Sequence, residues 1–328
     1  MAVFSRDLIL EIAQNLDIKS MLALGETNKE NNSLIKTYEH SLSLSRIATF
    51  PVPPTGNVLT SEVYLRRPLK HGNFAMVLEL ERRRSRIAEV LTASPHFNIK
   101  CPPGLGELTH AQQDFLRELL ERAFSHCDSI ADIAANLPHE VRGAKWYERR
   151  FVSWWEDRQL LEGFRMNDPY TNYVARPVQR EYIRGLCKQD LTMIYYLVHV
   201  MASAFTKSRK DWIDSDPTFW ERITVFEEYV LRHGSWYAWA HFIGNDEWQD
   251  MATSISRIGL AELTRFEFGH EDALPSLQSE LILQFNELYD SSDNSIKALH
   301  AAVKGLVVES KDRPDDQGEK RNEVRNSE

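Results

Sequence analysis

The densest group of side chains able to do chemistry lies near the middle of the second half of the chain. It comprises His233, Trp236, Trp239 and His241, with Gly234 following the first histidine. Histidine can transfer protons or contact ligands, and tryptophan commonly lines apolar pockets. The aromatic residues of this stretch also recur at helical spacing, which is the pattern of a buried helix face. The stretch therefore predicts either a substrate or ligand pocket or an aromatic core.

Two further groups of reactive residues predict structural roles. His126 precedes Cys127, but neighbours on a helix point about 100° apart, so they cannot form a nucleophile and base couple with each other. Asp211, Asp214 and Asp216 crowd one loop without the glycine and terminal glutamate of a calcium loop. We expect Cys127 to be an ordinary cysteine and the aspartates to cap helices.

Recognisable catalytic and metal-binding motifs are missing from the sequence. It has no glycine-rich phosphate loop, nucleophile elbow, paired-histidine zinc helix or EF-hand loop. Its 3 cysteines, Cys101, Cys127 and Cys187, are too few for a four-thiolate zinc site and are odd in number. We predict a protein that is not an enzyme and that uses no cofactor or metal.

Composition and charge limit the classes of partner and the cellular compartment that we expect. The net charge of -9 argues against a nucleic-acid surface, which needs clustered lysine and arginine. The sequence has no run of eighteen or more apolar residues, so it predicts no membrane span, and the first residues do not resemble a signal peptide. The few, widely spaced cysteines suit a reducing compartment. We expect no nucleic-acid or membrane partner and a cytoplasmic and/or nuclear location.

One basic cluster has two interpretations. It comprises Arg82, Arg83, Arg84 and Arg86. The cluster could be a nuclear-import signal. However, Glu79 and Glu81 precede it at the spacing that forms ion pairs along a helix. The favoured interpretation is a solvated helix face.

The periodicity of apolar residues indicates helices almost throughout. A helix containing Phe74 ends near Ser94, and another begins at Thr109, where Gln112 completes a capping-box pattern. Long apolar runs at helical spacing follow over 186–201 and 219–242, and a last pair spans 274–288 and 296–307. No sustained two-residue alternation occurs, so strands are few. The predicted fold is mainly all-α: an N-terminal helical unit and a larger, irregular helical C-terminal domain.

Proline, glycine and charge patterns suggest the limits of these units. Three prolines and a glycine punctuate residues 51–56, which favours a stiff linker after an N-terminal unit of residues 1–50. The helical domain then covers residues 57–308. The last stretch, 309–328, is charged and nearly free of apolar side chains, so it predicts a disordered tail.

The N-terminal unit begins with two short amphipathic helices between Phe4 and Lys29. Ser5 can cap the first helix, and Asp7 places negative charge at the positive end of the helix dipole. Asp17 separates two apolar stripes. Helices this short are marginal alone, so both stripes need a further surface to pack against.

This stretch resembles an F-box. The residues in register with the family pattern are Asp7, Leu8, Ile9, Ile12, Leu16, Met21, Leu24, Thr27, Asn28 and Lys29. Phe4-Ser5 stands where the family has Leu-Pro, and Asn28 where it commonly has Cys or Ser. The resemblance covers roughly the first forty-five residues, and the following domain shows no leucine-rich, WD or kelch repeat. The chain is similar to fungal-type F-box proteins with a degenerate N-terminal F-box and a helical domain.

The resemblance implies a role without chemistry of its own. Such a protein is a substrate-recognition subunit of an SCF-type cullin-RING ubiquitin ligase, and it presents an unknown protein substrate through the domain after the linker. The resemblance implies that the contacts to a Skp-type adaptor come from Phe4, Leu8, Ile9, Ile12, Leu16, Met21, Leu24, Thr27 and Lys29.

A second interpretation remains open at this point. The N-terminal hairpin could be part of a single all-helical domain that binds a small ligand or is an unrecognised enzyme. The two interpretations differ in exposure. An F-box must offer Leu8, Ile9 and Met21 to its partner, whereas an integral hairpin must bury them in its own chain.

Overall fold

The computed structural model describes residues 5–60, 67–137, 175–213, 215–268, 276–291 and 295–309. The predicted all-α class is confirmed: in these ranges α-helices dominate, and the two strands contain two residues each. Strands β1 (Val58–Leu59) and β2 (Pro68–Leu69) pair antiparallel, with Val58 opposite Leu69. The predicted tail, 309–328, lies outside the described residues after Glu309.

Four short helices build the N-terminal unit, and all but the last of them start at a side-chain cap. They are α1 (Arg6–Asn15), α2 (Ile18–Glu26), α3 (Lys29–Thr37) and α4 (Glu39–Ile47). The predicted cap is confirmed: the Ser5 hydroxyl accepts from the Leu8 amide at 3.3 Å. Asp17 caps α2 in the same way, and Asn28 caps α3. Asn28, a departure from the F-box pattern, therefore has a structural reason to be there.

The N-terminal helices do not form a core by themselves. Their buried apolar side chains share one cluster with the strand pair and the first two turns of α5 (Phe74–Ala93). The members of this cluster are Ala13, Ile18, Met21, Ile35, Leu42, Ile47, Val58, Leu69, Phe74, Met76, Val77 and Leu80. The core thus continues past the predicted linker at 51–56 and ends within α5.

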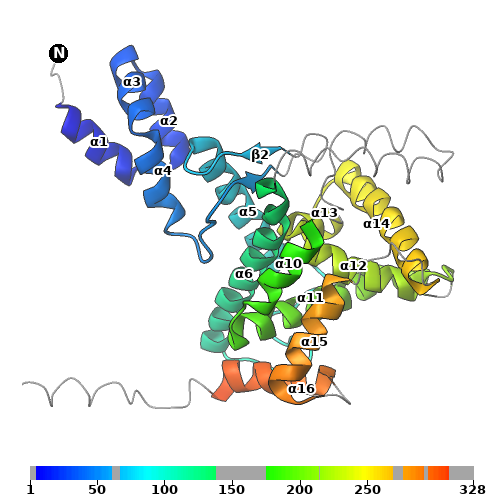
Figure 1. Ribbon diagram of the computed structural model, residues 1–328. Helices are drawn as coiled ribbons and strands as arrows, with labels where there is room; N and C mark the ends of the chain where they lie inside the picture. The colour runs from blue at the N-terminus through cyan, green and yellow to red at the C-terminus, as the bar shows by residue number, and fades with distance from the viewer. Residues whose placement is uncertain are drawn as a thin grey trace, which may run out of the picture.

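The remaining helices form the body of the molecule. They are α6 (His110–Asp132), α10 (Ala175–Arg184), α11 (Lys188–Ser208), α12 (Phe219–His233), α13 (Ser235–Phe242), α14 (Asp246–Glu267), α15 (Leu277–Tyr289) and α16 (Ser295–Lys304). Short helical turns extend them at Ile133–Asn136, Lys210–Trp212 and Gly305–Glu309, the last of these π-helical. Figure 1 shows α1–α4 at one end of the molecule and α15 and α16 at the opposite end.

Helix α11 lies at the centre of the body and packs against α6, α12, α15 and α16. It is apolar all round, as a helix covered on every side must be. The predicted capping box of α6 is confirmed, because Thr109 accepts from the Gln112 amide while Gln112 accepts from the Thr109 amide. Local side-chain caps also start α11, α14 and α15, at Cys187, Asn245 and Ser276.

The chain leaves the proline-rich segment at a fixed point. The Asn136 amide side chain donates to the Asn57 carbonyl at 2.8 Å and accepts from the Asn57 amide at 2.8 Å. A Cβ on Gly56 would overlap the Asn136 amide, so a larger residue here would displace that side chain. The exit of the segment is thus tied to the short helical turn that follows α6.

Candidate functional site

Helix α1 exposes two large apolar side chains at the outer end of the molecule. Leu8 and Ile12 are each 39% exposed, whereas the neighbouring Ala13 is fully buried. Residues four apart on a helix lie one above the other, so Leu8 and Ile12 form one apolar strip. The strip is held in place because Arg46 of α4 donates to the Ala13 carbonyl at 3.2 Å. Two exposed aliphatic side chains on a fixed helix can serve as anchors for a partner.

The other residues implied as adaptor contacts do not all reach the surface. Ile9, Leu16 and Leu24 are half-buried, and Thr27 and Lys29 are exposed.

Met21 is fully buried in the N-terminal core, and Phe4 lies outside the described residues. The expectation that Met21 contacts a partner is therefore wrong for this structure. The physical reason is that α2 packs on both α3 and α5, which cover its apolar face.

The predicted pocket around residue 236 is packed interior. His233, Trp236 and His241 are buried, and their rings contact other aromatic rings. The ring centroids of Tyr229 and His233 are 5.0 Å apart, and those of Tyr237 and His241 are 4.7 Å apart. The aromatic-core interpretation of this stretch therefore agrees with the structure.

The fourth residue of the predicted pocket, Trp239, is half-buried and joins α13 to α5. Its indole nitrogen donates to the carboxylate of Glu89 at 2.7 Å.

Burial lowers the pKa of His241 to about 3, so this imidazole is neutral at pH 7. A neutral ring enclosed by aromatic side chains is placed for packing rather than for proton transfer to a ligand.

The break between α12 and α13 depends on one glycine and one distant aspartate. Gly234 has a φ of 66°, and a Cβ there would overlap the carboxylate of Asp128 on α6. Asp128 accepts hydrogen bonds from the Ser235 amide at 2.8 Å and from the Ser235 hydroxyl at 2.9 Å and 3.0 Å. The first free amide of α13 is thus capped by a side chain from another helix.

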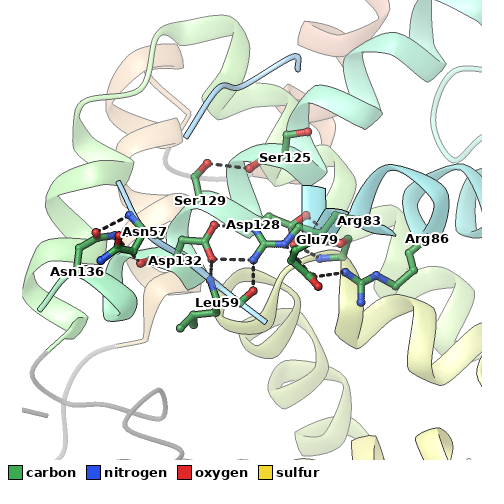
Figure 2. A network of polar contacts seen from close by, with 11 residues as sticks. Asn57, Leu59, Glu79, Arg83, Arg86, Ser125, Asp128, Ser129, Asp132 and Asn136 are labelled. Atoms are coloured by element: carbon green, nitrogen blue, oxygen red, sulfur yellow. Dashed lines mark hydrogen bonds and ion pairs between the residues drawn. The ribbon is translucent and has the colours of Figure 1, made fainter. Parts of the chain in front are cut away.

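A buried charge network ties β1, α5 and α6 together (Figure 2). The Arg83 guanidinium donates to both carboxylate oxygens of Asp132, at 2.6 Å and 2.8 Å, and to the Leu59 carbonyl at 2.7 Å. Asp132 also accepts from the Leu59 amide at 2.8 Å. Although burial opposes it, the Asp132 carboxylate raises the pKa of Arg83, so the guanidinium stays charged.

The basic cluster on α5 is therefore only partly the solvated face that its sequence predicts. Arg82 and Arg84 are exposed, but Arg83 and Arg86 are buried. The predicted pairing of Glu79 at helical spacing is confirmed, since its carboxylate lies 3.9 Å from the Arg82 guanidinium and 3.4 Å from that of Arg83. Glu79 also lies 3.0 Å from Arg86, seven residues on, which was not predicted. The prediction of exposure was wrong for Arg83 and Arg86. Asp132 at the end of α6 and the Leu59 carbonyl of β1 hold Arg83 in the interior, and the buried Glu79 pairs with Arg86.

A second polar cluster, which the sequence did not indicate, forms around Asp190 at the start of α11. Arg122 donates to both of its carboxylate oxygens, at 2.6 Å and 2.9 Å. The Cys187 thiol donates to Asp190 at 3.2 Å, and His126 lies 3.3 Å from the same oxygen. The pattern Cys-x-x-Asp before an apolar run was the available signal, because it is a helix start.

The Asp190 cluster has a structural role and not a catalytic one. Burial opposes it, but the hydrogen bond from Arg122 holds the pKa of Asp190 below its ordinary value. A carboxylate held ionised in this way is a weak base for the Cys187 thiol. The cluster joins α6 to the start of α11.

The other cysteine considered, Cys127, is fully buried, and burial raises the pKa of its thiol, as expected for an unreactive cysteine.

Within the described residues, no group of three or more histidine, cysteine, aspartate or glutamate side chains is placed to hold a metal ion. None of the helices in that part of the chain is long and apolar enough to cross a membrane. Comparison with known proteins finds no matching family model, no matching curated protein and no matching solved structure.

Proposed function

We propose that this chain is a non-enzymatic, F-box-like substrate-recognition subunit that binds a Skp-type adaptor of a cullin-RING ubiquitin ligase through α1. The observation that supports it is the apolar strip of Leu8 and Ile12, which a chain using α1 only for its own core would bury. The body of the molecule would then present a protein substrate. The proposal places the chain in the cytoplasm and/or the nucleus.

The contact surface follows from exposure. The central anchors are Leu8 and Ile12, with the half-buried Ile9 beside them on α1 and the half-buried Leu16 directly after that helix. Lys29 contributes charge at the turn between α2 and α3, where an open hollow has a volume of about 420 Å³. Apolar anchors supply most of the affinity in such helix contacts, while charges at the rim mainly affect association rate and register.

The test is binding of the full-length chain to a purified Skp-type adaptor by isothermal titration calorimetry. Replacing Leu8 or Ile12 by alanine removes a central anchor and should cost about 2 kcal/mol, roughly 30-fold in affinity. The double variant Leu8→Asp/Ile12→Asp should abolish binding. Because both side chains are partly in solvent, the variant should stay folded by circular dichroism.

A matched control comes from the same helix. Gln14→Asp adds a negative charge at an exposed position two residues beyond Ile12, and residues two apart point about 200° apart around a helix. This variant should bind the adaptor like the unmodified chain. Lack of binding by the unmodified chain, or unfolding of the double variant, would refute the proposal and make the N-terminal helices ordinary core.

A further inference from the structure

Two histidines lie against each other where α16 packs on the central helix of the body. His199 belongs to α11 and His300 to α16, and their ring centroids are 5.3 Å apart with the ring planes tilted by 57°. Both side chains are half-buried. In Figure 1, α16 forms the end of the molecule opposite to α1–α4. A charge on either ring therefore acts directly on the contact between α11 and α16.

The ring of His300 is enclosed by α11 and by the loop of residues 101–106 that precedes α6. A Cβ on Gly104 would overlap the Cγ, Nδ1 and Cδ2 atoms of His300, so the loop lies directly against that side of the ring. The Tyr196 ring meets His300 edge-on, with 6.4 Å between centroids, and the Tyr196 hydroxyl donates to the Pro103 carbonyl at 2.8 Å. Three segments of the chain thus meet at one imidazole.

The remaining nitrogen of this ring suits only the neutral form. Nε2 of His300 is buried, and within the described part of the chain no group forms a hydrogen bond with it. A protonated imidazole carries a donor hydrogen on both nitrogens. A buried donor of a charged group that lacks an acceptor is costly, so the closed structure disfavours the protonated ring.

Among the described residues, no acidic side chain compensates a positive charge on the pair. Helix α16 packs on α11, on α15 and on the short turn that follows it. On α15, Glu280 is bound by Arg180 and Arg184, while Glu287 and Asp290 are exposed. None of these carboxylates affects the pKa of either histidine.

The other titratable groups near the pair are exposed or neutral. Lys297 and Lys304 lie on α16, three residues before and four residues after the histidine, and both are exposed. The loop contributes the exposed Cys101, and Lys100 and Glu107 beside it are exposed as well.

From α11, the titratable neighbours within one turn of His199 are Tyr195 and Tyr196. Burial raises the pKa of both hydroxyls, so both are neutral. The charge that each histidine meets at close range is therefore that of the other histidine.

Acid favours separation of the two rings. Burial lowers the pKa of both histidines, and positive charge on His300 lowers the pKa of His199 further. Once α16 has moved away and both rings are in water, the ordinary histidine pKa of about 6.5 applies. The separated form thus binds more protons below about pH 6.5, and the closed form keeps its full stability above about pH 7.

We propose that His199 and His300 form an acid-sensitive latch, which holds α16 on α11 while both rings are neutral and releases α16 when they are protonated. Two like charges repel each other strongly in a partly dry site, and release lets water solvate both. Release also uncovers the buried Leu299 and Val303 of α16, so the acid form presents an apolar surface that the neutral form hides. The latch is remote from α1, and the inference does not depend on adaptor binding.

Hydrogen exchange read by mass spectrometry on the full-length chain tests the release. Protection factors, corrected for the intrinsic exchange rate, are compared at about pH 7.5 and about pH 5.5, on either side of the ordinary histidine pKa. We expect the protection of α16 to fall by roughly tenfold at the lower pH while that of α6 is kept. Unchanged protection of α16 would overturn the proposal. An equal loss in α16 and α6 would also overturn it, because that is unfolding of the whole chain.

Glutamine variants assign the response to the pair. The double variant His199→Gln/His300→Gln keeps polar side chains but cannot gain a proton, so α16 should stay protected at both pH values. His110→Gln, at an exposed position of α6, is the matched control and should keep the full acid response. The same loss in the double variant as in the unmodified chain would overturn the assignment to these two histidines.

An NMR titration of the histidine ring protons tests the coupling without relying on the double variant. His300→Gln removes the neighbouring charge, so the pKa of His199 should rise toward the ordinary value of about 6.5. His110→Gln should leave the pKa of His199 unchanged. A pKa of His199 that is the same with and without the His300 ring would show that the two rings do not interact, and would overturn the latch.

Discussion

Arg83 and Asp132, 49 residues apart in the sequence, meet through two parallel hydrogen bonds of 2.6 Å and 2.8 Å. The pair links α5, which completes the N-terminal core, to the end of α6 in the body. Both side chains are buried. Breaking the pair leaves a charged group without its partner in a site of low polarity.

We therefore expect Arg83→Met to lower the free energy of unfolding by about 3–5 kcal/mol, measured by urea denaturation. Arg82→Met is the matched control, because the neighbouring Arg82 side chain is 61% exposed and its change should stay within about 0.5 kcal/mol. The double variant Arg83→Met/Asp132→Leu should recover part of the loss. Similar effects of Arg82→Met and Arg83→Met would show that the buried pair does not stabilise the fold.

The glycine between α12 and α13 should tolerate no side chain. Gly234→Ala forces a side chain into a backbone conformation that costs about 1–3 kcal/mol, and its Cβ also overlaps Asp128. Gly106 provides the comparison: its φ is 76°, but a Cβ there meets nothing within 4 Å. Chemical denaturation should give a clearly larger loss for Gly234→Ala than for Gly106→Ala. Equal losses would mean that the approach of Asp128 is unimportant.

Acid should destabilise the fold through His241. The pKa of His241 is about 3 in the folded chain, and that of an unfolded histidine is about 6.5. Between these values the unfolded chain binds more protons, so stability is complete above about pH 7 and falls as the pH drops from 6.5 toward 3. The slope from this residue approaches about 1.4 kcal/mol per pH unit.

The variant His241→Leu should remove this part of the pH dependence. Urea denaturation at several pH values should give parallel curves for the two proteins above about pH 7 and a shallower acid slope for the variant. A slope that the substitution leaves unchanged would show that His241 is accessible to protons in the folded chain.

Leu8 and Met21 should separate binding from folding. Met21 is fully buried in the N-terminal core, so Met21→Ala should lower the free energy of unfolding by about 2–5 kcal/mol. Leu8→Ala should change the free energy of unfolding much less, because Leu8 is 39% exposed. It should instead weaken binding of the adaptor. Thermal or urea unfolding of the two variants gives the comparison. A large loss of stability in Leu8→Ala would count against the exposed strip.

Short-range sequence signals explain most of the local structure. The cap at Ser5 and the capping box of Thr109 and Gln112 each join residues three positions apart in the sequence. Helical periodicity also predicted the all-α class. Such features depend on the chain's neighbours along the sequence and can be predicted from it.

Contacts between distant segments decided the rest. Arg83 lies on α5 beside the exposed Arg82, yet it is buried because Asp132 and the Leu59 carbonyl, 49 and 24 residues away, reach it. The His241 side chain is also polar, and it is buried only because the packing of α12 and α13 encloses its ring.

The sequence alone determined where many of the helices begin, since a capping side chain and the amide that it accepts from lie three positions apart. The start of α13 is an exception, because Asp128 of α6 caps it. Which side chains of those helices face the core, pair their charges or remain open to a partner was decided only by the tertiary structure. The exposed Leu8 and the buried Met21 show the difference, because both are apolar residues of short amphipathic helices. The burial of each depends on which other helix covers it, and that is a property of the whole fold.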